Sequence, residues 1–306
     1  MTTFKTIAVM GTGTMGPGMG AVLVRAGYQV ALYDTSTEAL ERAKAGYELA
    51  WGVLDRLETP TVEGGSVRYA SDVADALAGA EFVIEAIPEN LELKQRVYAE
   101  YEQHIRPDVI IASNTSGIPA TKIAANLAHP ERVIVTHWSN PPHLIPMIEI
   151  VPGEQTNQAT VDGATALVNS IGYFPCLLKK EVPGFVENRI LYAIMRECLA
   201  LVDEGVVGME ELDLNVKWGI GYKLAVIPPM QLLDMAGMDI YTAVATYLNP
   251  DLSNTAEVSP TIGAQVAKGR LGLKTKGGLF DYTDEQVVAL RAQRGMSLVK
   301  VRKALS

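Results

Sequence analysis

Residues 137 to 149 contain a histidine and a carboxylate that could cooperate in proton transfer. A strand-like apolar run ends at His137, and Pro141 and Pro142 then stop regular structure, because proline lacks the N–H that a strand or helix needs. A second strand-like run carries Glu149, which could reach back to the imidazole. A general base held by an orienting acid has this arrangement, although an isolated His–Glu pair is more often structural.

A glycine-rich turn near the N-terminus has the spacing of a dinucleotide site. Gly11-Thr-Gly13-Thr-Met-Gly16 follows a strand-like run, opens a helical stretch and precedes a second strand-like run that ends at Asp34. The first glycine permits a tight turn, the second lets the backbone approach a pyrophosphate, and the third lets helix pack on strand. The free amides at the helix N-terminus would hold the pyrophosphate. A glycine-rich loop without a ligand is the alternative.

The cofactor expected from this unit is NAD. Asp34 would accept a hydrogen bond from the adenosine ribose and repel a 2′-phosphate. Residues 35 to 37 are Thr-Ser-Thr, so no arginine is offered to NADP there.

Strands and helices alternate over the first 182 residues. Strand-like runs occupy residues 5–10, 29–34, 67–69, 81–87, 109–113, 132–136, from 147, and 174–179, with helical runs at 37–58, 72–77, 91–104, 119–127 and 156–171. This order predicts an α/β fold with a Rossmann-type doubly wound parallel sheet, whose ligands gather at the carboxyl ends of the strands. Gly11, Asp34, Glu89, Ser116 and His137 all fall at such ends.

The remainder of the chain has no convincing strand. Helical runs lie near residues 186–204, 209–218, 229–235, 239–248, 261–268 and 284–304. The sequence therefore predicts an NAD-binding Rossmann domain at residues 1–182. An all-helical C-terminal domain for substrate binding and dimerisation follows at residues 183–306.

The composition excludes several classes of function. The chain has 306 residues, 48% hydrophobic and 20% charged, with a net charge of −9 that argues against a nucleic-acid or anionic-membrane partner. Cys176 and Cys198 are too few for a disulfide framework and lack a metal-type spacing, so no metal is expected. No apolar run reaches the roughly 18 to 20 residues of a membrane span. The cytoplasm is the expected location.

With these motifs in order, the chain resembles the L-3-hydroxyacyl-CoA dehydrogenase family over nearly its full length. The matching segments are residues 11–16, 83–89, 113–116, 137–142, 149, 183–189 and 272–282. The resemblance implies an NAD-dependent oxidoreductase, a dehydrogenase acting on a CH–OH or hydrated aldehyde group of a small-molecule substrate. It also implies a homodimer formed through the helical domain.

The resemblance assigns roles to individual residues. His137 becomes the base that takes the hydroxyl proton, and Glu149 fixes its tautomer and stabilises its charged form. Ser116 and Asn188 would hydrogen-bond the reacting oxygen or nearby substrate groups, although each could instead be only a turn or helix-start residue. Asn140 would help shape the same site. The cofactor contacts implied are Gly11, Gly13, Thr14, Met15, Gly16, Asp34, Ala86, Ile87, Glu89, Lys94 and Asn114.

Two departures point away from CoA esters. Residues 35 to 71 hold four basic residues against six acidic ones, so a CoA 3′-phosphate would find little positive charge there. The stretch around Lys223 is similar to the non-CoA members L-gulonate 3-dehydrogenase (lambda-crystallin) and L-carnitine dehydrogenase. The segments around His137 and around Trp218–Tyr241 are similar to 5-formyl-3-hydroxy-2-methylpyridine 4-carboxylate 5-dehydrogenase. We therefore expect a small hydroxy- or formyl-carboxylate substrate, with Lys223 as its counter-ion or simply as a solvated lysine.

Three alternatives stay open. The chain could be an L-3-hydroxyacyl-CoA dehydrogenase acting on CoA thioesters. It could be a non-catalytic, crystallin-like NAD-binding protein, although the full set of site residues favours catalysis. The β-hydroxyacid dehydrogenases share a similar glycine-rich opening, but their catalytic lysine has no counterpart in residues 183–189.

Overall fold

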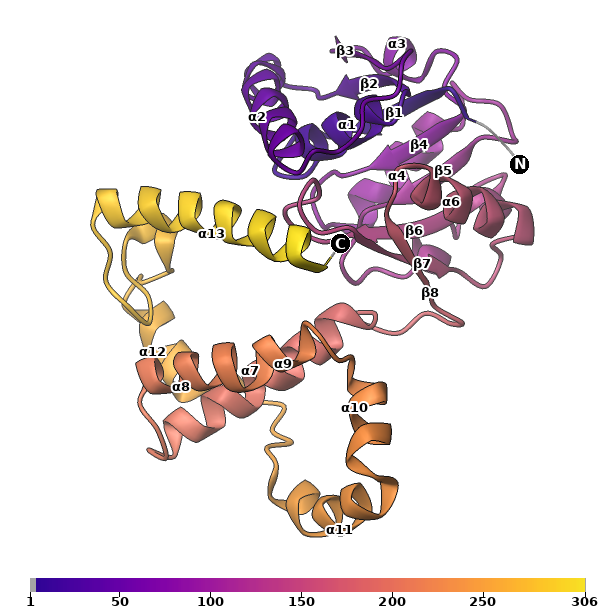
Figure 1. Cartoon of the computed structure of the whole chain (residues 1–306). Helices are drawn as coiled ribbons and strands as arrows, with labels where there is room; N and C mark the ends of the chain where they lie inside the picture. Colours follow the sequence, from indigo (N-terminus) through magenta and orange to yellow (C-terminus); the bar gives the residue numbers. More distant parts are fainter. Residues whose placement is uncertain (1–3, 306) are drawn as a thin grey trace. The chain divides into compact units, whose positions relative to one another are not determined.

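A computed structural model describes residues 4–305 of the chain (Figure 1). The chain separates into two compact units, Met1–Asn188 and Arg189–Ser306. The domain boundary expected from the sequence, at residues 182 and 183, stays a prediction.

The first unit is built on one eight-stranded sheet with the strand order β3-β2-β1-β4-β5-β6-β7-β8. The strands are β1 (Thr6–Met10), β2 (Gln29–Tyr33), β3 (Ser66–Ala70), β4 (Phe82–Glu85), β5 (Ile110–Ser113), β6 (Val133–Trp138), β7 (Met147–Pro152) and β8 (Phe174–Leu177). The predicted doubly wound α/β fold is confirmed, and the strand order reverses between β1 and β4, where ligands bind in such sheets. The sheet is not wholly parallel, because β6 and β7 pair antiparallel.

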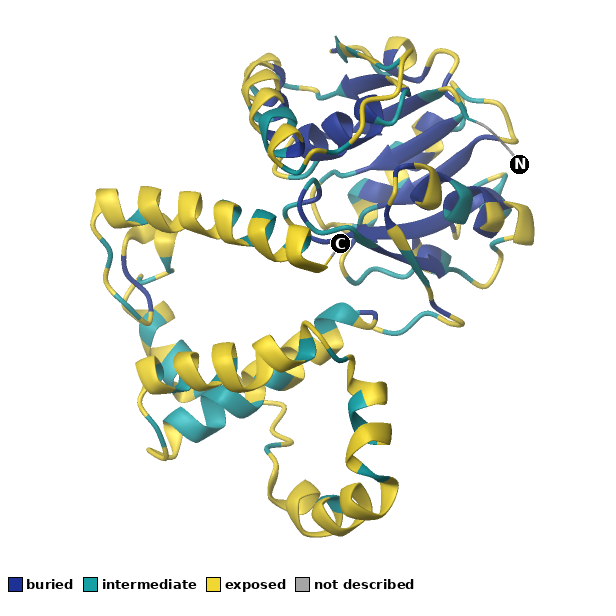
Figure 2. Ribbon diagram, viewed as in Figure 1, coloured by how far each residue is buried: buried dark blue, intermediate teal, exposed yellow. Residues whose placement is uncertain are grey.

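Helices cover both faces of this sheet, and each face has its own buried cluster. The helices are α1 (Gly16–Arg25), α2 (Thr37–Arg56), α3 (Val73–Leu77), α4 (Leu91–Tyr101), α5 (Ala120–Ile123) and α6 (Gln158–Ser170). Leu23 and Leu32 belong to one cluster, and Tyr98 and Ile111 belong to the other. Figure 2 shows the strands buried between the two helical layers. This packing holds the carboxyl ends of the strands in fixed positions.

The helix expected at residues 119–127 is much shorter than predicted. It covers only Ala120–Ile123. The Glu102 side chain accepts hydrogen bonds from the backbone N–H groups of Ala128 and His129 at 2.9 and 3.0 Å. These contacts draw the chain out of the helix before it enters β6.

Local caps set the start of the helices that flank the site. The Ser36 hydroxyl accepts from the N–H of Ala39 at the start of α2, and the Asn90 side chain accepts from Leu93 at the start of α4. Such caps satisfy donors that the first helical turn leaves unpaired. The turns that follow Asp34 and precede Lys94 are therefore held in place.

The second unit is helical, as predicted. Its helices are α7 (Glu187–Asp203, which begins in the first unit), α8 (Met209–Asn215), a π-helical stretch at Val216–Gly221, α9 (Tyr222–Leu224), α10 (Pro229–Ala236), α11 (Met238–Leu248), α12 (Pro260–Ala267) and α13 (Asp284–Leu305). Strand-like pairing within the described part of this unit is limited to isolated bridges among Gly272, Gly277 and Asp281.

The helices of the second unit bury almost nothing. None of the described residues in α7 to α13 is buried, and large apolar side chains such as Trp218 and Tyr247 are 60% and 65% exposed. Figure 2 shows these helices as exposed or half-buried along their whole length. Helices in water depend on packing an apolar face, and the second unit by itself leaves much of this apolar surface uncovered.

Within residues 4–305, no helix combines the length and the apolar character needed to cross a lipid bilayer.

Candidate active site

The antiparallel β6–β7 hairpin brings the histidine and the carboxylate together. His137 and Glu149 are direct cross-strand partners in its register, and His137 Nδ1 lies 2.8 Å from Glu149 Oε2. Both side chains are buried. The turn between the strands thus sets a contact between residues twelve positions apart in the chain.

The second oxygen of Glu149 is occupied as well. Glu149 Oε1 accepts hydrogen bonds from the backbone N–H groups of Val186 and Glu187, at 2.8 and 3.0 Å, where α7 begins. Burial works against the charge of Glu149, but the bonds from His137, Glu187 and Val186 outweigh it and lower its pKa below the ordinary 4.5. The carboxylate is therefore anionic near neutral pH and holds the imidazole through Nδ1.

An aromatic ring in a strained backbone position packs beside this dyad. The ring of Phe185 lies 5.6 Å from the ring of His137, centroid to centroid. Phe185 has a φ of 50°, a left-handed conformation that is costly for an aromatic residue. It is nonetheless buried, so the surrounding structure holds this turn against the strain.

Ser116, Asn188 and Glu89 form a second group of polar residues. Glu89 Oε1 accepts from the Thr115 hydroxyl at 2.6 Å, and from the N–H and hydroxyl of Ser116 at 3.1 and 3.3 Å. Asn188 Nδ2 donates to the Ser116 carbonyl at 3.3 Å. The structure therefore brings these three predicted residues together, and the Ser116 hydroxyl is directed to Glu89.

The residues beyond the β4 and β5 ends join the sheet to the glycine loop. The N–H of Ala86 donates to the Met10 carbonyl at 2.8 Å, just before Gly11. Asn114 Oδ1 accepts from the N–H of Trp138 at 2.9 Å, next to His137. Asn114 thus connects the end of β5 to the strand that carries the candidate base.

The glycine loop fits a dinucleotide. Gly11 has a φ of 109°, and a Cβ there would lie 2.6 Å from the Ala86 carbonyl oxygen. A Cβ on Gly13, in contrast, would meet nothing within 4 Å, so the backbone is open on that side. Thr14 and Gly16 lead directly into the free N–H groups of α1.

Asp34 lies at the end of β2, as a ribose-binding acid should. Its Oδ2 accepts from the N–H and hydroxyl of Thr12 at 2.9 and 3.0 Å, and its Oδ1 accepts from the N–H of Ser36 at 3.1 Å. These bonds fix the carboxylate at the edge of the glycine loop.

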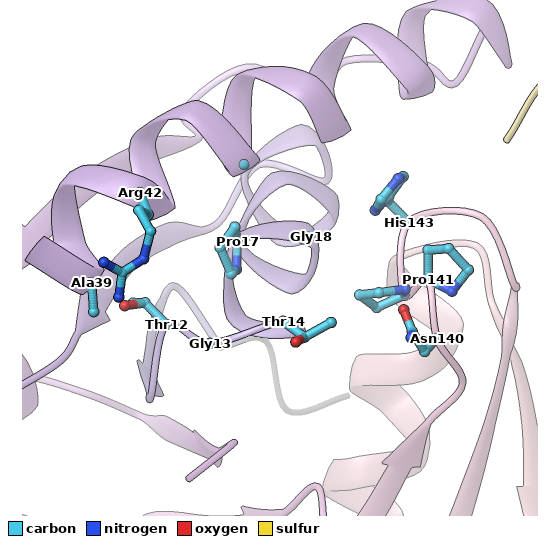
Figure 3. A pocket seen from close by; sticks show the side chains of 12 residues that line it. Thr12, Gly13, Thr14, Pro17, Gly18, Ala39, Arg42, Asn140, Pro141 and His143 are labelled. Atoms are coloured by element: carbon cyan, nitrogen blue, oxygen red, sulfur yellow. The ribbon is translucent and has the colours of Figure 1, made fainter. Parts of the chain in front are cut away.

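A pocket of about 510 Å³ opens over the same loop (Figure 3). Its walls come from the loop and α1, from α2, and from the turn after β6. The lining residues are Thr12, Gly13, Thr14, Pro17, Gly18, Ala39, Arg42, Gly46, Asn140, Pro141, Pro142 and His143. Asn140, predicted as a substrate contact, thus shares a pocket with the predicted cofactor residues Gly13 and Thr14.

Lys94 has an unexpected partner. Its Nζ lies 2.7 Å from Glu85 Oε1, and both side chains are almost fully buried. Glu85 also accepts from the Ser113 hydroxyl at 2.7 Å and the Tyr98 hydroxyl at 3.2 Å. Burial raises the pKa of Tyr98, so its hydroxyl remains a donor. Lys94 is 3.6 Å from Glu89 Oε2, and its contact with the cofactor stays a prediction.

The sequence reasoning missed Glu85, Glu187 and Arg42. A glutamate inside the apolar run 82–87 was a signal for Glu85, since a buried charge needs partners. Arg42 lies on α2, eight residues after Asp34, and the dinucleotide motif does not specify a residue at that distance.

Glu187 stands close to the dyad. Its carboxylate accepts a hydrogen bond from the Ser139 hydroxyl. One ligand atom each of His137, Glu149 and Glu187 lie within 4.8 Å of one another. That set resembles a cation site, but both Glu149 oxygens already accept hydrogen bonds from His137 and from the start of α7.

Lys223 lies on α9 in the second unit, and its role as a counter-ion stays a prediction. Burial raises the pKa of both Cys176 and Cys198, which keeps the two thiols protonated and weakly nucleophilic.

Two family models match nearly the whole chain. The model described as 3-hydroxyacyl-CoA dehydrogenase, NAD binding domain, matches residues 6–182, and that of the C-terminal domain matches residues 184–282. The chain belongs to the 3-hydroxyacyl-CoA dehydrogenase family. It is accordingly an NAD-dependent dehydrogenase, which confirms the predicted cofactor and enzyme class.

Relatives of this dehydrogenase include non-CoA enzymes. It is 50% identical over 303 residues to 5-formyl-3-hydroxy-2-methylpyridine 4-carboxylate 5-dehydrogenase of Mesorhizobium japonicum, covering 98% of each chain. It is 37% identical to the L-carnitine dehydrogenase of Streptomyces coelicolor, covering 76% of this chain and 74% of the relative. A crystal structure of a 5-formyl-3-hydroxy-2-methylpyridine 4-carboxylic acid 5-dehydrogenase, described as an NAD⁺-dependent dismutase, superposes with a TM-score of 0.97 at 50% identity over 99% of both chains.

Proposed function

We propose that this enzyme oxidises a small formyl- or hydroxy-carboxylate of the kind named for its pyridine-carboxylate relative, with His137 as general base. The observation that carries the proposal is the 50% identity to that relative across 98% of both chains. The His137–Glu149 contact of 2.8 Å supplies the base that such chemistry needs.

The chemistry requires a proton acceptor beside a hydride acceptor. NAD, when bound, supplies the hydride acceptor. Glu149 accepts the Nδ1 hydrogen of His137, which leaves Nε2 with a lone pair for the substrate hydroxyl proton. As the C–H bond breaks and the carbonyl forms, that proton passes to Nε2, and Glu149 stabilises the imidazolium. We expect Ser116 and Asn188 to steady the oxygen that carries the developing charge. For this the Ser116 hydroxyl must turn away from Glu89, and the Asn188 amide must use its second N–H.

An aldehyde enters the same scheme as its hydrate. Water adds to the formyl carbon to give a gem-diol, whose C–H bond and hydroxyl group are equivalent to those of an alcohol. Oxidation of the gem-diol gives a carboxylic acid. Reduction of a second aldehyde in the reverse direction gives the alcohol, with His137 returning a proton.

The first test is dismutation of an aromatic formyl-carboxylate. With NAD⁺ at one hundredth of the aldehyde concentration, we expect the aldehyde to yield acid and alcohol in equal amounts. Product quantification by NMR would measure the ratio. Acetoacetyl-CoA serves as the comparison substrate, because the family name points to CoA esters. Turnover of the CoA ester without turnover of the small carboxylates would contradict the proposed substrate class.

We also propose that the enzyme is a homodimer held together by its second unit. The helices there leave side chains such as Trp218, Met230 and Tyr247 exposed at 60 to 69%. We expect sedimentation to give twice the chain mass of 33.0 kDa. We also expect the melting temperature to rise with protein concentration, because association stabilises the folded state by mass action. A monomer with a concentration-independent melting temperature would refute the proposal.

A further inference from the structure

One basic side chain in the dinucleotide pocket has no hydrogen-bonding partner among residues 4–305. Arg42 lies on the second turn of α2 and lines the pocket over Thr12, Gly13 and Thr14. Figure 3 shows its guanidinium group directed toward Thr12. Among residues 4–305, no side chain or carbonyl forms a hydrogen bond or ion pair with it.

The neighbouring charges explain why Arg42 stays available. Glu38 is one turn earlier on α2, but its carboxylate accepts from the Ser36 hydroxyl at 2.8 Å and attracts Arg42 only at longer range. Lys44, by contrast, pairs with Glu41 at 2.6 Å. Arg42 therefore presents an unneutralised cation to the pocket.

The adjoining loop is where a negative charge must be accommodated. The pyrophosphate of a dinucleotide carries two charges, whereas the N-terminus of α1 supplies the equivalent of only about half a positive charge. The chain itself carries a net charge of −9. A guanidinium fork matches the oxygens of a phosphate and forms charge-assisted hydrogen bonds that are about twice as strong as neutral ones.

We propose that Arg42 binds the pyrophosphate of NAD and neutralises it above the glycine loop. The open side of Gly13, where a Cβ would meet nothing within 4 Å, lets the phosphates approach within reach of the guanidinium. Arg42 thus belongs to the cofactor site although it is eight residues beyond Asp34.

A contact with a 2′-phosphate is the alternative role of an arginine in this region. Asp34 opposes it, because its carboxylate is fixed at the ribose end by three hydrogen bonds from Thr12 and Ser36. A phosphate on that ribose would meet a carboxylate. The guanidinium accordingly serves the pyrophosphate that NAD and NADP share.

The test is a calorimetric titration of the full-length enzyme with NAD⁺ and with ADP-ribose, which keeps the pyrophosphate but lacks nicotinamide. The variant Arg42→Met keeps much of the side-chain length without the charge. We expect it to weaken binding of both ligands by about 10-fold, the loss of one charge-assisted hydrogen-bonding group. Arg42→Lys should recover part of the affinity.

Lys44→Met is the matched control, since it removes a charge from the same helix outside the pocket, and it should leave both dissociation constants unchanged. Circular dichroism and thermal melting establish that each variant folds. Unchanged affinity of Arg42→Met for NAD⁺ and ADP-ribose would overturn the proposal. NADP⁺ is titrated in the same way, and a loss of affinity confined to NADP⁺ would also overturn the proposal, because it would place Arg42 at the ribose phosphate.

Discussion

Replacing His137 with asparagine is expected to lower kcat/KM by about 10²- to 10⁴-fold, the usual contribution of a general base. Asparagine cannot accept a proton in place of Nε2, so the substrate hydroxyl loses its proton only to solvent. Binding of NAD⁺ should remain near the wild-type value, because His137 lies near the end of β6, whereas the phosphates are expected at the glycine loop between β1 and α1. Steady-state kinetics and calorimetric titration with NAD⁺ measure the two quantities separately.

His104 provides the matched control for this substitution. It is an exposed histidine near the end of α4, and His104→Asn should leave the kinetics unchanged. Preserved turnover in His137→Asn would exclude His137 as the base and would leave it a binding or structural role.

Glu149→Gln is expected to reduce kcat about as strongly, by about 10²- to 10⁴-fold, because it would hold the imidazole of His137 in the wrong tautomer. The glutamine amide still accepts the N–H groups of Val186 and Glu187 through its oxygen. Its NH₂ group then faces His137 Nδ1 and donates to it, so the imidazole proton moves to Nε2, where the base needs its lone pair. The double variant with His137→Asn should be hardly worse than either single variant, because the two residues act as one unit.

The same variant carries a pH-dependent stability effect. The pKa of Glu149 is lowered on folding, so its charge stabilises the folded state at pH values above the ordinary value of 4.5. This contribution is lost as the pH falls through the lowered pKa of the folded protein. The difference in unfolding free energy between wild type and Glu149→Gln should therefore be full at pH 7 and shrink below about pH 4. Urea titrations at several pH values would show a constant difference if Glu149 were not charged.

The sequence predicted those features of the fold that depend on local pattern. Alternating apolar runs gave the strands and helices of the first unit, and the glycine spacing located the loop between β1 and α1. The antiparallel pairing of β6 and β7 was harder to foresee, since two strands joined by residues 139–146 can pair in more than one way. The hydrogen bonds of Ala128 and His129 to Glu102 ended α5 early, and such a distant contact leaves no local signal.

In the site, too, the sequence predicted what local patterns determine and missed what depends on distant contacts. His137 and Glu149 could be paired because each lies in a strand-like run at a recognisable place. Lys94 stays a predicted cofactor contact, whereas its bond to Glu85 had no signal in the sequence, because it depends on the packing of α4 against β4. Arg42 reaches the pocket through the geometry of α2, which no spacing rule from Asp34 describes.

The two sets of hydrogen bonds that Glu149 accepts make the orientation of the base depend on the start of α7. One carboxylate oxygen holds the imidazole of His137, and the other holds the first backbone N–H groups of α7, which continues into the second unit. Pulling that first turn away would leave the buried carboxylate with one of its three hydrogen-bond donors, His137, and would free it to rotate. The imidazole would then lose its fixed direction. The hydrogen bonds to the two oxygens of Glu149 are therefore coupled: the imidazole keeps its orientation only while the start of α7 stays bound to the carboxylate.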